Sequence, residues 1–193
     1  MSKSTIKKLL KSMTKDEIIT MVLELYSARK EAKDYLEFYA EPDEQGKLEE
    51  YKDIIREEFY PKRNREPQMR FSVCRKAVSD FKKLKPPADA IAELMVSYME
   101  WAIQATYDYC DLWEQYYDSV EGNFSKTIDF IVENDLWKKY DDRLQQCVKL
   151  SSHSGYGFGD TIDDIYFNGR LNYMDLTGDD SDFIDVEDGE LEK

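Results

Sequence analysis

The sequence predicts an all-α protein of six to eight helices in consecutive antiparallel hairpins, forming an irregular bundle or a short solenoid-like array around residues 87–110. Three observations support this fold class. Apolar residues recur at helical spacing along most of the chain. The stretch 86–111 is apolar on most of its circumference. Hydrophobic residues make up 41% of the chain and aromatic residues 13%, which argues against a disordered protein.

The stretch 86–111 is the element around which we expect the others to pack. Pro86 and Pro87 suit a helix start, where a missing N–H has no intrahelical partner to lose. Its polar residues recur every three or four positions and therefore share one narrow stripe: Glu93, Ser97, Glu100, Gln104, Asp108 and Asp111. Since the rest of the helix is apolar, it needs neighbours on several sides.

The N-terminal segment predicts one short helix and one longer one. Residues 4–13 are basic and amphipathic, and we expect them to dock on the protein. Thr14 and Glu17 have the spacing of a capping box at the start of the next helix. A polar interval at 27–31 predicts a kink or a break in that helix. Its expected inward positions are Ile18, Met21, Val22, Leu25, Tyr26, Ala32, Tyr35, Leu36 and Tyr39.

The segment before the central helix predicts two further helices. A turn around 42–46 precedes a helix over 48–59, which Pro61 ends. A very basic loop follows, and helical spacing resumes over 69–84.

After the central helix, residues 112–136 are expected to continue as helix, with a weak point at Gly122, and 136–150 to form a last long helix. The run 151–160 predicts a loop whose aromatic residues, Tyr156 and Phe158, pack back on the bundle. Asp160 is expected to cap one short helix or two turns after it.

Length and composition predict one helical domain, residues 1–174, followed by an acidic tail, 175–193, with the composition of a disordered segment. The three cysteines form no CxxC pair and lie in amphipathic patterns, which predicts core thiols in a reducing compartment. Since no apolar run approaches the roughly 20 residues of a membrane span, we expect a cytoplasmic protein without membrane contact.

Charge is distributed unevenly along the chain, whose net charge is -14. Residues 1–85 hold 20 Lys and Arg against 16 Asp and Glu, whereas residues 86–193 hold 7 against 25. Such asymmetry indicates an acidic tail, a basic contact face or an internal match between halves. The tail is therefore open to three interpretations: binding a basic partner, covering the basic loop, or aiding solubility.

The basic segment 62–76 is the candidate binding site. Arginines beside the aromatic residues Tyr60 and Phe71 are able to hold phosphates and stack on bases. The overall negative charge disfavours nucleic acid, and pairing of these cations with the acidic C-terminal half or tail is the alternative. The candidate partner- or anion-binding residues are Lys62, Arg63, Arg65, Arg70, Arg75 and Lys76.

No catalytic, cofactor-binding or metal-binding residue is predicted. The single histidine, His153, removes most histidine-dependent metal and triad chemistry. An all-carboxylate metal site around Glu93 and Glu100 is a remaining alternative, and a solvated polar stripe is the simpler interpretation. GYGFGD at 155–160 lacks the Lys-Ser/Thr of a phosphate-binding P-loop.

The order of these features resembles a family of uncharacterised bacterial all-helical proteins, a domain of unknown function. The resemblance lies in the Lys-rich opening, LEEYKDIIREEFYP, the RKAVSDFKKL helix and GYGFGDTIDDIY, and it covers about residues 4–170. It implies a small bacterial cytoplasmic protein and carries no activity, cofactor or site residue.

The resulting functional hypothesis is a cytoplasmic helical protein-interaction or adaptor module, with a protein partner and with the basic loop and the tail as contact surfaces. A nucleic-acid-associated regulatory protein that uses the loop 62–76 is the first alternative, and a carboxylate-based metal-dependent enzyme is the second. The chain is expected to be a monomer, or a homodimer formed through Trp113, Tyr116, Tyr117 or Trp137.

Overall fold

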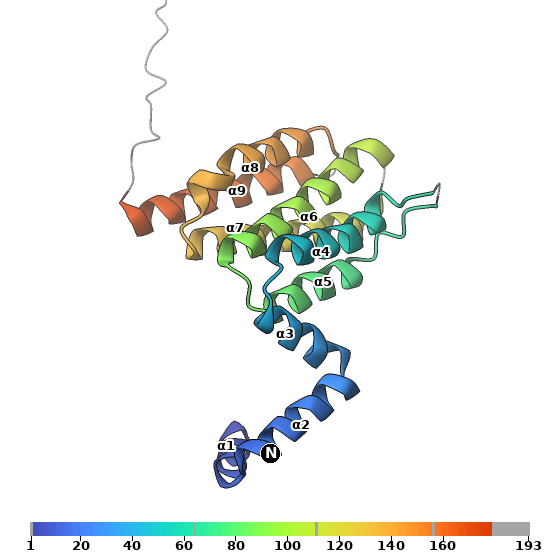
Figure 1. Ribbon diagram of the computed structural model, residues 1–193. Helices are drawn as coiled ribbons and strands as arrows, with labels where there is room; N and C mark the ends of the chain where they lie inside the picture. Colours follow the sequence, from blue (N-terminus) through green and yellow to red (C-terminus); the bar gives the residue numbers. More distant parts are fainter. Residues whose placement is uncertain (1, 64, 111, 156, 179–193) are drawn as a thin grey trace, which may run out of the picture.

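The computed structural model describes residues 2–63, 65–110, 112–155 and 157–178, and over these ranges it is all-α, with nine helices and no strand (Figure 1). The predicted fold class is confirmed, with one helix more than the expected maximum. The helices are α1 (Lys3–Ser12), α2 (Lys15–Ala28), α3 (Lys30–Ala40), α4 (Glu44–Phe59), α5 (Phe71–Lys83), α6 (Ala88–Tyr109), α7 (Glu114–Glu133), α8 (Trp137–Ser151) and α9 (Phe158–Thr177).

Helices α4 to α9 form a bundle, the body of the protein, with α6 at its centre. α6 packs against α4, α5, α7 and α8, and α9 packs against α7 and α8. More than half of the side chains of α6 are buried, as its apolar circumference predicts. The core is rich in aromatic rings, and Phe59, Phe71 and Tyr116 meet there at near-perpendicular angles.

The joins between helices differ from the prediction at two places. Cys110 has φ of 48°, a left-handed conformation that ends α6 and separates it from α7, where continuous helix was expected. The last helix, α9, has 20 residues instead of one short helix or two turns, and it begins after the left-handed Gly157. Asp160 therefore lies in its first turn and is not its cap.

The last helix extends past the predicted end of the domain. α9 continues through Thr177, so residues 175–177, which the sequence places in the tail, are helical. The acidic residues 179–193 lie outside the described part of the chain, as do Asp111 of the predicted polar stripe and Tyr156. Phe158 is buried, as expected.

The N-terminal helices start and end where the sequence predicts. Thr14 and Glu17 form the capping box: the Thr14 N–H donates to the Glu17 carboxylate at 2.7 Å, and the Glu17 N–H donates to the Thr14 hydroxyl. The predicted break is present at Arg29, between α2 and α3. The expected docking of α1 is wrong, because this helix has no buried residue. Of the expected inward positions in α2, Ile18, Met21, Val22 and Tyr26 are partly buried and Leu25 is exposed, and none is fully buried. In α3 the buried residue is Phe38, whereas Tyr39 is exposed.

Two predictions about which side chains are buried are wrong in part. Cys74 and Cys147 are buried thiols as predicted, but Cys110 is exposed. Of the aromatic residues expected to form a homodimer surface, three lie in the core: Tyr116, Tyr117 and Trp137. Trp113 is half exposed.

Two helical glycines should respond in opposite ways to alanine. At Gly169 a Cβ would lie 2.1 Å from Cγ2 of Ile128 and 3.3 Å from the Trp137 ring, whereas at Gly122 it would meet nothing within 4 Å. We expect Gly169→Ala to lower the free energy of unfolding by about 1–2 kcal/mol through overpacking. We expect Gly122→Ala to raise it by about 0.5–1 kcal/mol through helix propensity. Urea denaturation measures both changes, and stabilisation by Gly169→Ala would contradict the packing of α9 on α7 and α8.

Candidate functional site

Arg70, at the end of the predicted basic loop, is bound to a buried carboxylate of α4. The side chain of Glu58 is only 4% exposed. It accepts hydrogen bonds from the Arg70 backbone N–H at 3.0 Å and from Nε and Nη2 of the same residue at 3.0 and 2.7 Å. Burial raises the pKa of Glu58, but these hydrogen bonds outweigh it and hold the pKa below its ordinary value. Arg70 therefore fastens the loop to α4.

Three more of the predicted binding cations are also paired within the body. Lys62 Nζ donates to Asp53 at 2.9 Å, and Arg65 donates to Glu57, so both join the loop to α4. Lys76 pairs with Asp80, one turn further along α5. These acids belong to α4 and α5, so pairing with the acidic C-terminal half is wrong for the described residues.

The remaining two predicted binding residues are Arg63 and Arg75. Both are exposed, and neither has an ion pair with any residue that the structure describes. Arg63 lies in the loop, which extends away from the bundle in Figure 1, whereas Arg75 lies on α5. The structure therefore does not bring the six predicted residues into one site.

The aromatic residues beside the loop are engaged in the body. Phe71 is 8% exposed and packs against Phe59 and Tyr98. The Tyr60 hydroxyl donates to Asp108 of α6 at 2.7 Å, and its ring stacks on Tyr109. Neither ring is free to stack on a nucleic-acid base.

The first half of the polar stripe of α6 is covered by an arginine of α8, whereas Asp108 near the end of the helix is exposed. Arg143 donates from Nε and Nη2 to the two carboxylate oxygens of Glu100, both at 2.7 Å, and from Nη1 to Glu93 at 2.5 Å. Lys52 of α4 donates to the other oxygen of Glu93 at 2.7 Å. Burial raises the pKa of Glu93, but the hydrogen bonds from Lys52 and Arg143 outweigh it and lower the pKa.

This arrangement assigns the two carboxylates of the metal hypothesis to an ion-pair network that joins α4, α6 and α8. Glu93 and Glu100 each already neutralise a cation of the protein. Over the described ranges there is no group of three or more His, Cys, Asp or Glu residues able to hold a metal ion. The network is bidentate at Glu100, a geometry that fixes the position of α8 on α6.

The N-terminal arm, defined here as α1 and α2, is the feature that the sequence patterns did not identify as a site. The arm projects from the body in Figure 1, and α3 joins the two. Large apolar side chains of the arm are exposed: Ile6 42%, Leu9 53%, Ile19 45%, Leu23 59% and Leu25 48%. A stable monomer does not ordinarily leave every apolar residue of two successive helices outside its core.

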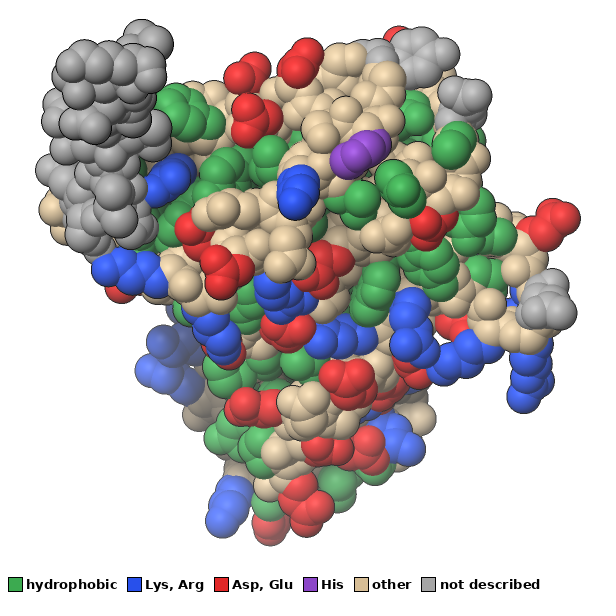
Figure 2. Space-filling view, turned by 90° about the horizontal axis from the view of Figure 1, so that it is seen from above, with side chains coloured by type: hydrophobic (Ala, Val, Ile, Leu, Met, Phe, Trp, Pro, Cys, Tyr) green, Lys and Arg blue, Asp and Glu red, His purple; other side chains and the backbone are tan. Residues whose placement is uncertain are grey.

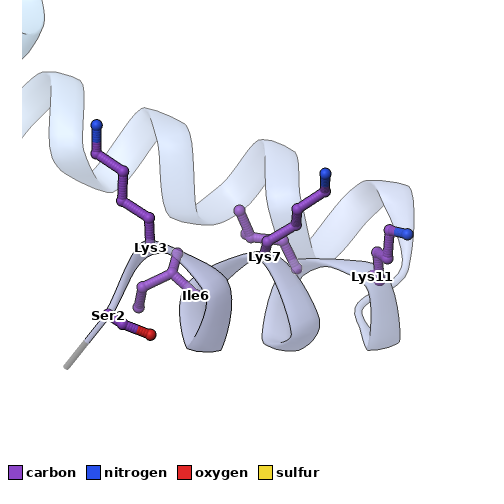
Figure 3. A pocket seen from close by; sticks show the side chains of 6 residues that line it. Ser2, Lys3, Ile6, Lys7 and Lys11 are labelled. Carbon is purple, nitrogen blue, oxygen red and sulfur yellow. The ribbon is translucent and has the colours of Figure 1, made fainter.

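One face of α1 combines two apolar side chains with a row of lysines. Lys3, Lys7 and Lys11 are four residues apart and line a hollow of α1 together with Ile6 and Leu10. Figure 3 shows the three lysines following one another along α1, with Ile6 between the first two. The body surface is different: Figure 2 shows acidic and basic side chains interleaved across the face seen from above.

The sequence contained a signal for the arm. Residues 4–13 are basic and amphipathic, but an amphipathic pattern indicates only that one face needs an apolar neighbour. The turn at Arg29 and the direction of α2 decide whether that neighbour belongs to the same chain.

The chain matches the model of a family of unknown function, DUF6155, over residues 1–156. The comparisons with curated proteins and with solved structures found no match. Among the described residues, no helix has the length and apolar character needed to cross a membrane. The matched residues comprise α1 to α8, which include the arm, the basic loop and the Arg143 network. The chain therefore belongs to DUF6155, a family of unknown function.

Proposed function

We propose that this protein is a helical protein-interaction module that binds another protein chain through its N-terminal arm. The observation that carries the proposal is that α1 and α2 contain no buried residue, although their apolar side chains have helical spacing. Burying one such leucine contributes about 1.5–3 kcal/mol, so an apolar partner surface would gain affinity from this face. We thus propose the arm as the contact surface in place of the basic loop.

The side chains of the arm indicate the chemistry of its partner. The lysines of α1 favour carboxylates at the edge of an apolar strip, as on an amphipathic helix that lies in a groove. A lipid surface fits less well, because Asp16, Glu17 and Glu24 give α2 negative charge. The nucleic-acid alternative has less support, because four of the six loop cations are paired with acids of the body.

The same proposal includes a cytoplasmic location. Cys74 and Cys147 are buried free thiols, and burial raises the pKa of each to about 12. Such thiols remain protonated and serve as small apolar core residues. A protein with free thiols fits a reducing compartment, as the sequence predicts.

Charged substitutions in the arm test the proposed function. We expect Leu9→Asp with Leu23→Asp to abolish partner binding, because two carboxylates would enter an apolar contact. Since both side chains are more than half exposed, the free energy of unfolding should change by less than about 0.5 kcal/mol. The measurement is quantitative affinity purification of the full chain from its own host, with and without nuclease.

The matched control is Phe167→Asp, which places a carboxylate at an apolar side chain of α9 that is 54% exposed. This variant should keep the partner. Multi-angle light scattering shows whether the partner is a second copy of this chain. A partner that survives both arm substitutions, or material lost on nuclease treatment, would refute the proposal.

A further inference from the structure

A separate groove lies in the body, where α5 and α7 flank α6. It has a volume of about 480 Å³, within the range of small-molecule sites. Val78 of α5 and Met95 of α6 give it an apolar surface, and Tyr98 forms part of its wall. At one end Lys82 of α5 lies 4.4 Å from the centre of the Phe130 ring of α7, so the two flanking helices meet there. None of these residues belongs to the arm.

The charge of the groove is opposite to that of the protein. Four cations line it and no carboxylate does, in a chain of net charge -14. Lys83 is paired with Asp80, but Arg75 and Lys126 have no ion pair among the described residues. Lys82 is partly buried, and the loss of hydration lowers its pKa. A bound anion would offset this cost for Lys82 and give Arg75 and Lys126 a counter-ion.

Tyr98 contributes its ring, and not its hydroxyl, to the groove wall. The residue is 2% exposed, and its ring packs against Phe59 and Phe71 of the core. Its hydroxyl is buried beside the thiol of Cys74, and burial raises the pKa of both groups. The apolar surface of the groove therefore consists of Val78, Met95 and the Tyr98 ring.

We infer that this groove binds a small organic anion, whose carboxylate or phosphate head lies among Arg75, Lys82 and Lys126 and whose compact apolar body rests on Val78 and Met95. The inference goes beyond the proposed function, because it concerns a different surface and a different class of ligand. A basic rim with an apolar surface selects a molecule that carries both features.

Matched ligands test this inference by isothermal titration calorimetry on the full chain. Octyl phosphate, below its aggregation concentration, should bind at one site. Octylammonium has the same apolar body with opposite charge, and inorganic phosphate has the head alone. Each should bind at least about tenfold more weakly, because each lacks one of the two features. Comparing octanoate with octyl phosphate shows whether the groove prefers a carboxylate or a phosphate. The anion that binds more tightly carries the preferred head group.

Matched variants locate the site. We expect Arg75→Gln with Lys126→Gln to weaken octyl phosphate about tenfold. Arg63→Gln with Lys149→Gln removes the same charge from exposed positions outside the groove and should change the affinity by less than about twofold. Equal effects of the two double variants, equal affinity for octylammonium, or no saturable binding of either anion would overturn the inference.

Discussion

Replacing Arg143 by methionine is expected to lower the free energy of unfolding by about 2–3 kcal/mol. The substitution keeps most of the apolar stem of the side chain and removes its charge. It leaves Glu100, and partly Glu93, as carboxylates without their guanidinium donors in a region where both are only 24–34% exposed. Removing one partner of a fully buried pair costs about 3–5 kcal/mol, and the residual solvent exposure here reduces that value. Urea denaturation at pH 7 measures the change.

A double-mutant cycle with Glu100 separates the ion pair from packing. Glu100→Gln removes the charge that Arg143→Met leaves unpaired, so the double variant should be more stable than the sum of the single effects predicts, by at least about 1 kcal/mol. Arg143→Lys keeps the charge but loses the planar two-point contact, and it should fall between wild type and Arg143→Met. Additive single effects would show that the network does not hold α8 on α6.

Replacing Glu58 by alanine is expected to have the second large effect, lowering the free energy of unfolding by about 2–3 kcal/mol. Glu58 is buried, and its carboxylate accepts the Arg70 backbone N–H and two guanidinium N–H groups. Alanine would leave that backbone N–H without its acceptor and would open a small cavity beneath the loop. The isosteric Glu58→Gln fills the same volume and should cost less. Chemical denaturation of both variants measures the two values.

The pH dependence of the same site has a definite sign. Because the pKa of Glu58 is lower in the folded protein than its ordinary value of 4.5, its contribution to stability is present above about pH 4.5. That contribution is lost as the pH falls through the lowered pKa of the folded state. The stability difference between wild type and Glu58→Gln should therefore shrink below pH 4.5. A difference that stays constant from pH 7 to pH 3 would contradict this account.

At these two sites, charged residues of the protein pair with each other and hold its own segments together. Segment 62–76 is basic in sequence, but its Arg70 holds the loop on α4 through Glu58. Glu100 of α6 holds α8 through Arg143. Cations that are already paired with carboxylates of the same protein contribute little to the long-range attraction of a partner. The cations that have no ion pair in the described residues include those of α1 and Arg75, Lys82 and Lys126 around the groove of α5 to α7.

The prediction from sequence succeeded for features that depend on residues close together in the chain. The capping box at Thr14 depends on two residues three positions apart, and the apolar circumference of α6 demands burial whatever surrounds it. It failed at Cys110, where a single left-handed residue ends α6, because a non-glycine residue there gives no local signal. It also made no prediction at Gly169, whose missing Cβ permits α9 to lie close to α7 and α8.

The sequence by itself determined an all-α fold, the position of the central helix and most helix boundaries, because helix periodicity, caps and breakers act within a few residues. Tertiary structure decided which charges are neutralised, which apolar faces stay uncovered, and which helices enclose the groove. Several of these properties depend on contacts between residues from different helices, such as Arg143 with Glu100 and Glu93, 43 and 50 positions apart, or Arg70 with Glu58, 12 positions apart. No pattern within one segment specifies the partner at that distance, so the arm and the groove became visible only in the folded chain.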